Sequence, residues 1–258
     1  MLVGGGTRHR GHQLSGGSRV LKRALDFVLA GIGIVLALPL LALIAVAVRF
    51  TSGRPILHRA RRIGRGGSQF TMFKFRTMVR DAEFQVVSLA HVNLGVGMVR
   101  IPNDPRVTAF GRWLRRSSLD ELPQLWNVLR GDMSIVGPRP HETHELARDL
   151  RTHGQRLAVR PGLTGLWQVR ARHDPSVETR IHWDLEYLTH QSLLLDLRII
   201  LRTVPAVIRG LLGRATVPAK PTGADRTGAS PHSRQGERPS GDGPQAPVNP
   251  PGSAGRSL

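Results

Sequence analysis

The sequence predicts a mixed α/β fold, namely a mainly helical, monotopic membrane protein that attaches to one face of a bilayer. Three observations support this prediction. An apolar run at 27–48 contains no charged side chain, which is typical of a membrane helix. A glycine-rich turn between two short alternating segments predicts a small β-hairpin within 56–75. Much of the remaining chain has apolar residues at helical spacing, and its last apolar stretch is typical of an amphipathic helix at the membrane interface.

The charge balance restricts the class of partner. The 258-residue chain has a formal net charge of +19 and a pI near 11.8, so we expect an anionic partner: nucleic acid, an anionic membrane or a phosphorylated substrate. Aromatic residues make up only 5% of the chain, fewer than a protein that stacks bases normally carries. We therefore do not expect nucleic acid as a partner. The lack of cysteine excludes disulfides and thiolate metal sites.

The apolar run has the length of a membrane helix, but two features argue against a simple crossing. As a helix it would reach roughly 33 Å, about the thickness of a bilayer core. Pro39 lies near its middle, where proline removes a hydrogen bond and kinks a helix. Both flanks are basic, and because Lys- and Arg-rich segments beside a membrane helix usually stay on the cytoplasmic side, both flanks are expected there. These flanking residues are Arg19, Lys22 and Arg23 before the run, and Arg49, Arg54, Arg59, Arg61 and Arg62 after it.

A helix that enters the bilayer, breaks at Pro39 and returns satisfies both basic flanks. We therefore favour a re-entrant membrane helix at 19–51 and keep a spanning helix as the alternative. A buried helix of a soluble domain is disfavoured, because soluble helices seldom stay free of polar residues for this long.

The segment after the apolar run is basic and predicts the hairpin. Glycines within 64–67 mark a turn between the short runs 56–57 and 70–75. Lys74 and Arg76 alternate with two phenylalanines, so both should project from one face of the second strand. Two interpretations fit these residues and can coexist: a basic collar against anionic lipid headgroups, or a phosphate-binding site.

Two adjacent carboxylates, Asp120 and Glu121, stand out in a chain that is poor in acid. With Ser118 they match a capping box, in which a serine caps a helix and a glutamate occupies its third position. Acidic residues in a first turn also interact favourably with the helix dipole. Taken alone, this pattern predicts an ordinary helix start at Ser118.

The surrounding residues favour a phosphoryl-transfer site. Arg112, Arg115 and Arg116 directly precede the pair. Arg139 follows it between two prolines, which hold that side chain on a stiff backbone. Arginine forks and helix starts bind phosphate oxygens, and carboxylates bind Mg²⁺. Together these are the parts of a site that transfers phosphoryl groups.

Five motifs occur in an order that resembles one enzyme family. They are Lys74-Phe75-Arg76-Thr77-Met78, Asp104-Pro105-Arg106-Val107-Thr108, the segment 118–134, Gly137-Pro138-Arg139-Pro140 and the segment 160–169. The family is that of the bacterial sugar transferases, the monotopic polyprenyl-phosphate phosphoglycosyl transferases of the undecaprenyl-phosphate glucose/galactose phosphotransferase type. The resemblance runs from about Lys22 to Gly210, and five ordered motifs make it highly specific.

The resemblance implies an enzyme that transfers a sugar-1-phosphate from a UDP-sugar to undecaprenyl phosphate and releases UMP. This would be the first membrane step of exopolysaccharide, capsule, O-antigen or glycoconjugate synthesis, at the cytoplasmic face of the bacterial inner membrane. By position, Asp120 would be the nucleophile that holds a covalent phospho-sugar, and Glu121 would be the Mg²⁺ ligand. The family also anchors itself by a re-entrant helix broken at a proline, which matches Pro39.

Arg115 and Arg139 fall where the family places phosphate-contacting arginines. Asp120 should stay ionised near neutral pH, as a nucleophile must. With the residues inferred from the sequence pattern, the candidate phosphate-binding set is Lys74, Arg76, Arg112, Arg115 and Arg139.

The C-terminal part predicts two further helices and a tail. The segment 141–155 predicts a polar helix, with His141 and two other histidines solvated rather than bound to metal. The segment 193–212 is apolar but carries four charged residues, so we expect an amphipathic helix in the interface. The tail is rich in proline, glycine and serine, which favours disorder.

The expected organisation therefore has four parts: a disordered basic N-terminus at 1–18, the re-entrant helix at 19–51, a cytoplasmic-face catalytic domain at 52–212 and a disordered tail at 213–258. The partners expected are a UDP-sugar, undecaprenyl phosphate and membrane lipids, and a homodimer is left open. The alternative function is a non-catalytic basic scaffold on the membrane surface or a nucleic-acid-binding module.

Overall fold

The structure is a computed structural model that describes residues 14–82, 84–85, 101, 103–142, 154–172, 174 and 176–212. All of these lie in one compact unit that ends at Pro218. The disorder expected for the N-terminus and the tail falls largely outside the described residues. So does all of 143–153, where the polar helix was expected to continue.

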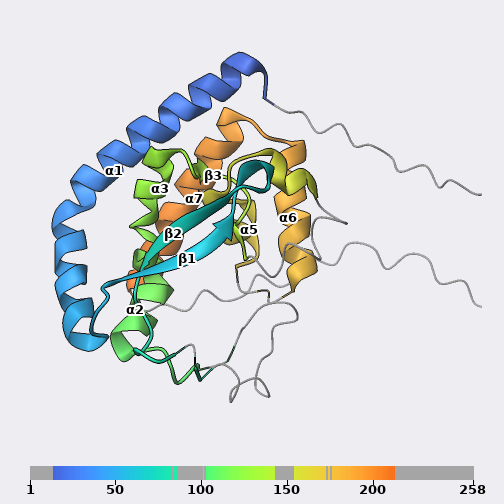
Figure 1. The fold of residues 1–258 in the computed structure, drawn as a ribbon. Coiled ribbons are helices and arrows are strands. Elements are labelled where there is room, and N and C mark those ends of the chain that lie inside the picture. Colours follow the sequence, from blue (N-terminus) through green and yellow to red (C-terminus); the bar gives the residue numbers. More distant parts are fainter. Residues whose placement is uncertain are drawn as a thin grey trace, which may run out of the picture. The chain divides into compact units, whose positions relative to one another are not determined.

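A single helix, α1 (Gly16–Thr51), contains the whole apolar run. It begins three residues before the expected boundary, where the Ser15 side chain accepts a hydrogen bond from the Ser18 N–H at 3.3 Å. Pro39 lies inside this continuous helix, and Figure 1 shows that α1 bends along its length without ending. Among the described residues, α1 is the one helix long and apolar enough to cross a membrane.

One face of α1 packs against the rest of the unit over most of its length, and its other side chains are exposed. Ala30 is buried in a cluster with Leu125 and Val128, and α1 runs beside the helix that carries them (Figure 1). Towards the other end, Ile44 and Val48 are buried in a second cluster. The large apolar residues between these contacts are mostly exposed, as in a surface that faces lipid.

Two small sheets lie beside α1. Strands β1 (Leu57–Ile63) and β2 (Gln69–Phe75) pair antiparallel around the turn η1 (Arg65–Gly67), which confirms the predicted hairpin. A short strand, β4 (His141–Glu142), pairs with the other edge of β1, so the sheet order is β2-β1-β4. Strands β3 (Ser134–Val136) and β5 (Gly162–Thr164) form a separate parallel pair.

Strand β4 corrects the expectation of a helix from His141 with a solvated imidazole. His141 is only 4% exposed, because pairing with β1 places it inside the fold. Burial, together with the nearby charges of Arg156 and Arg180, lowers the pKa of His141 to about 3, so its ring is neutral at physiological pH.

The remaining elements are helical. They are α2 (Ala109–Ser117), η3 (Leu119–Glu121), α3 (Gln124–Arg130), η4 (Gly154–Ala158), α5 (Leu166–Arg170), α6 (Val177–Thr189) and α7 (Leu193–Leu211). Helix α7 buries Ile199 in a cluster with Val136, Leu166 and Tyr187, whereas Leu201 and other apolar residues on α7 are exposed. Helix α7 therefore combines a face packed on the unit with an apolar face open to its surroundings.

Candidate active site

The two carboxylates lie in a tight turn and not at the start of a long helix. Ser118 ends α2 in a left-handed conformation with φ of 60°, which is uncommon for a residue other than glycine. Asp120 and Glu121 follow in the single turn η3, and the Ser118 side chain makes no capping hydrogen bond to it. The capping-box interpretation is therefore wrong. Strained backbone of this kind is concentrated at functional sites.

Arg172 holds this turn in place. Its guanidinium donates from Nη1 to the Ser118 hydroxyl at 2.7 Å and from Nη2 to the Arg115 carbonyl at 3.0 Å. The Arg115 carbonyl, in the last turn of α2, therefore accepts from Arg172 as well as from the Ser118 N–H at 3.4 Å. Sequence reasoning missed Arg172, whose only signal was its position just after the motif that ends at residue 169.

Glu121 carries the strongest charge contacts of the site. Lys74 Nζ, from β2, lies 2.9 Å from Glu121 Oε1, and Arg139 Nη1 lies 3.8 Å from the same oxygen. The Arg139 guanidinium also lies 5.7 Å from the centre of the Trp167 ring, within cation–π range. Burial by itself would raise the pKa of Glu121, but the charges of Lys74 and Arg139 outweigh burial and lower it to about 2.

Asp120 is the more buried carboxylate, with 7% of its surface exposed. Burial and the neighbouring Glu121 charge raise the pKa of Asp120 to about 6, against the opposing influence of Lys74 and Arg115. At neutral pH Asp120 is therefore mostly ionised while remaining more basic than an ordinary aspartate. No hydrogen bond or ion pair holds its carboxylate among the described residues. These properties suit a carboxylate nucleophile.

Asn127 joins the helix after the turn to the strand that carries Lys74. Its side chain is fully buried, and Nδ2 donates to the Thr71 carbonyl at 2.7 Å while Oδ1 accepts from the Phe73 N–H at 3.1 Å. Both partners lie on β2, the edge strand of its sheet. The amide therefore pairs backbone groups that an edge strand would otherwise leave open. It also fixes α3 and Glu121 relative to Lys74.

Glycines let the Arg139 segment lie directly against a second backbone turn. A Cβ on Gly162 would fall 2.1 Å from the Gly137 nitrogen, and one on Gly165 would fall 2.3 Å from the Gly137 oxygen. The Gly137 N–H also donates to the Thr164 carbonyl at 3.0 Å. Only glycine fits at these close approaches. The contacts place Arg139 beside Trp167 and Glu121.

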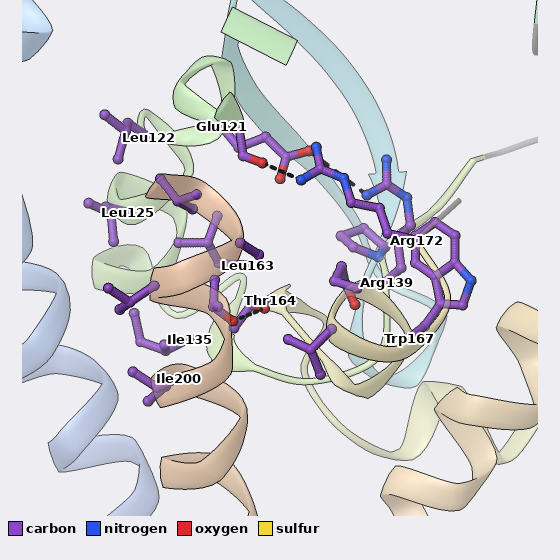
Figure 2. A pocket seen from close by; sticks show the side chains of 18 of the residues that line it. Glu121, Leu122, Leu125, Ile135, Arg139, Leu163, Thr164, Trp167, Arg172 and Ile200 are labelled. Carbon is purple, nitrogen blue, oxygen red and sulfur yellow. Dashed lines mark hydrogen bonds and ion pairs between the residues drawn. The ribbon is translucent and has the colours of Figure 1, made fainter. Parts of the chain in front are cut away.

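Glu121, Arg139 and Arg172 lie at the charged end of a cavity of about 720 Å³ (Figure 2). Figure 2 shows Glu121, Arg139 and Arg172 close together beside Trp167, with apolar side chains lining the other part. The apolar part is lined by residues that include Leu122, Leu125, Ile135, Leu163 and Ile200. A cavity of this kind can take a ligand that is anionic at one end and apolar at the other.

Comparison with known proteins identifies the family. A family model described as bacterial sugar transferase matches residues 17–210. The chain belongs to this family.

Over the aligned residues, three relatives are about 40% identical to this sugar transferase. It is 41% identical over 191 residues to the exopolysaccharide production protein ExoY of Rhizobium meliloti, covering 72% of this chain and 84% of the relative. It is 39% identical over 198 residues to the undecaprenyl-phosphate galactose phosphotransferase of Salmonella typhimurium, covering 74% of this chain and 41% of the relative. It is also 44% identical over 199 residues to the UDP-glucose:undecaprenyl-phosphate glucose-1-phosphate transferase of Xanthomonas campestris, covering 73% of this chain and 39% of the relative. The chain therefore spans about two fifths of the length of the last two relatives.

The structure brings some of the candidate phosphate-binding residues to the carboxylates and leaves others aside. Lys74 and Arg139 contact Glu121, and Arg115 donates to the Thr77 hydroxyl at 2.8 Å while its charge acts on Asp120. The other two arginines bond to backbone carbonyls: Arg76 to Arg54 at 2.9 Å, and Arg112 to Val107 at 2.9 Å. Of the five candidates, Arg139 alone is among the residues that line the cavity.

The carboxylates of Asp120 and Glu121 fit Mg²⁺ only if a phosphorylated ligand supplies further oxygen atoms. Among the described residues there is no group of three or more His, Cys, Asp or Glu side chains that could hold a metal ion. Mg²⁺ commonly binds one or two protein carboxylates and completes its shell with phosphate oxygens and water. Asp120 and Glu121 offer such carboxylates, although Lys74 already occupies one Glu121 oxygen.

Proposed function

We propose that this sugar transferase moves a sugar-1-phosphate from a UDP-sugar to undecaprenyl phosphate, releases UMP, and thereby carries out the first membrane step of a cell-surface glycan. The observation that carries the proposal is the cavity with two unlike ends. Glu121 and arginines lie at one end, next to Asp120 in the chain, and apolar side chains lie at the other. The names of the relatives, two of which specify undecaprenyl phosphate, support the same choice of acceptor.

The apolar end suits a polyprenyl chain because of the elements that build it. Leu29 comes from α1, Leu125 from α3 and Val204 from α7. Helices α1 and α7 are also the elements with the most exposed apolar residues. A lipid substrate could therefore enter from the bilayer between them while its phosphate reaches the arginines.

In the first step, an Asp120 carboxylate oxygen attacks the β-phosphorus of the UDP-sugar. The bond from that phosphorus to the bridging oxygen breaks, and UMP leaves with the electron pair. The product is a sugar phosphate bound to Asp120 as an acyl phosphate. Asp120 does not line the cavity, whereas Ser118 and Glu121 do, so its side chain must rotate towards the cavity for attack.

In the second step, a phosphate oxygen of undecaprenyl phosphate attacks the same phosphorus. The bond between the phosphorus and the Asp120 oxygen breaks, which frees the carboxylate and yields undecaprenyl diphosphate sugar. Arg139, Arg115 and Arg172 offset the repulsion between the anionic groups that meet in both steps. Splitting the transfer in two allows one anionic site to serve both substrates in turn.

Mg²⁺ is proposed as the cofactor, bound by Glu121 together with the diphosphate. When bound, it supplies positive charge that stabilises the leaving UMP. Lys74 would then turn from the Glu121 oxygen to a phosphate oxygen, since an ammonium group is itself a phosphate ligand.

We place the enzyme at the cytoplasmic face of the bacterial inner membrane, with α1 entering and leaving from the same side. Both ends of α1 support this. Arg23 donates to the Val128 and Leu129 carbonyls, and Val48 is buried with Leu114, so each end packs on the same unit. A helix that crossed the bilayer would carry one of these ends to the opposite side.

The deciding experiment is a trapping assay with the purified membrane protein, Mg²⁺ and a panel of radiolabelled UDP-sugars. Without lipid acceptor, we expect label on a peptide that contains residue 120, with release of one UMP per adduct. Addition of undecaprenyl phosphate should move the label to lipid. Product formation with no adduct on residue 120 would overturn the covalent mechanism, and no UMP release from any donor would favour the scaffold alternative.

A further inference from the structure

A second basic site lies at the N-terminal end of α1. A pocket of about 80 Å³ there shares no lining residue with the large cavity. Most of its wall comes from α1, from the hairpin turn η1 and from the end of η4 with the segment that follows it, and Ser134 of β3 and Gln191 complete the lining. Five cationic side chains line it: Arg19, Lys22, Arg23, Arg65 and Arg160.

The positive charge of the pocket is only partly neutralised. Asp26 is its one carboxylate, and both of its oxygens are engaged: the Ser134 hydroxyl donates at 2.7 Å and the Ile135 N–H at 2.9 Å. Lys22 forms an ion pair with Asp196 at 2.6 Å.

No such partner neutralises the arginines. Within the described residues, Arg19, Arg23, Arg65 and Arg160 make no ion pair with a carboxylate. Burial, and then the charges of Arg23 and Arg65, lower the pKa of Arg160, as expected where like charges are crowded. An anion in the pocket would relieve this repulsion.

Two of the arginines are already held in place. Arg23 donates to the Val128 carbonyl at 2.8 Å and the Leu129 carbonyl at 3.0 Å, and Arg160 Nε donates to the Gly131 carbonyl at 2.8 Å. A guanidinium has five N–H groups, so each keeps donors for a further ligand. Because these side chains are fixed by the end of α3, a ligand would not have to order them on binding.

An open apolar groove of about 570 Å³ adjoins the pocket and shares Arg19, Arg23 and Arg160 with it. Its other lining residues are Val20, Ala24, Phe27 and Val28 of α1, of which the last two begin the apolar run. Val28 lies about 7.5 Å along the helix axis beyond Arg23 at 1.5 Å per residue. The groove therefore starts at the arginines and continues along α1 for about this length, as a chain attached to a phosphate in the pocket requires.

We infer that this pocket and groove bind one anionic phospholipid, with its phosphate among the arginines and an acyl chain along the groove. Arginine forks match phosphate oxygens in geometry and charge. The pocket has room for about two or three waters at 30 Å³ each, which a phosphate group fills. The bound lipid holds the N-terminal end of α1 at the level of the headgroups, independently of catalysis.

Native mass spectrometry of the full chain, released from vesicles of equal parts phosphatidylglycerol and phosphatidylcholine, tests this inference. We expect one retained phosphatidylglycerol per protein. Arg65→Gln should weaken retention about fivefold, since one basic residue near an anionic headgroup contributes that much. The Arg65 side chain is exposed, and among the described residues its guanidinium makes no hydrogen bond or ion pair that the substitution would remove. Arg61→Gln, an exposed arginine of β1 outside the pocket, is the matched control and should retain lipid as the wild type does.

Equal retention in wild type and Arg65→Gln overturns the inference, as does an equal loss in Arg61→Gln. Retention of phosphatidylcholine at the same level shows a groove without charge selectivity and overturns it too. If millimolar inorganic phosphate displaces the lipid completely, the site is one for free phosphate. UMP release by Arg65→Gln in excess detergent should match the wild type, which separates this site from the catalytic cavity.

Discussion

Replacing Asn127 by leucine tests the claim that one buried amide holds the site together. Leucine is similar in volume, so the change leaves the Thr71 carbonyl and the Phe73 N–H without partners rather than opening a cavity. A buried backbone group left without a hydrogen bond costs about 1–2 kcal/mol, which gives about 2–4 kcal/mol for the pair. The two groups lie on either side of one strand residue and are lost together.

The assay is thermal unfolding in detergent at a fixed scan rate, because membrane proteins often unfold irreversibly. One kcal/mol shifts the midpoint by about 2–4 °C in a chain of this size, so we expect a decrease of about 4–16 °C. Gln69→Leu removes an exposed amide from the same strand and serves as the control, with a shift of less than about 2 °C.

Activity provides a second measurement on the same variant. Phe73 precedes Lys74 in β2. Loss of the Asn127 hydrogen bonds should therefore allow Lys74 to move away from Glu121, which should lower UMP release even at temperatures well below the unfolding midpoint. If Asn127→Leu unfolds within 2 °C of the wild type and keeps full turnover, the amide is not what aligns α3 with β2.

Further predictions concern the carboxylates, Lys74, the metal and the glycine contacts. Asp120→Asn should lower UMP release by more than about a thousandfold with an unchanged unfolding midpoint, and near-normal turnover would exclude Asp120 as the nucleophile. Because the pKa of Asp120 is raised to about 6 and its protonated form cannot attack, turnover should fall as the pH drops through about 6. Lys74→Met removes a charge that lowers this pKa, so the acid limb should move to higher pH; a move to lower pH would contradict the assignment. Chelation of divalent cations should stop UMP release while vesicle binding persists, and activity in excess chelator would rule out the Mg²⁺ proposal. Gly162→Ala should cost more than about 3 kcal/mol, since its Cβ would overlap the Gly137 nitrogen, and a normal yield of folded protein would show that the backbone can yield there.

The elements that follow from local sequence were the ones predicted well. The hairpin between Leu57 and Phe75 has alternating residues around a glycine turn, and glycine at positive φ supplies such a turn wherever it occurs. The long apolar helix depends only on an uninterrupted run of apolar residues. The predicted helix start at Ser118 was wrong, because a capping box is recognised from the spacing of residues alone. In the structure the Ser118 hydroxyl instead accepts from Arg172, which is distant in sequence.

The sequence by itself determined the family, the long apolar helix and the set of candidate site residues, because motifs and runs of apolar residues keep their order along the chain. Only the tertiary structure decided that Lys74 and Arg139 both contact one oxygen of Glu121. It also decided that Asn127 links α3 to β2 by hydrogen bonds and that His141 is buried. Each of these depends on contacts between segments far apart in the chain. The shifted pKa of Asp120 has the same origin, since burial and the charges around a carboxylate are set by everything that packs near it.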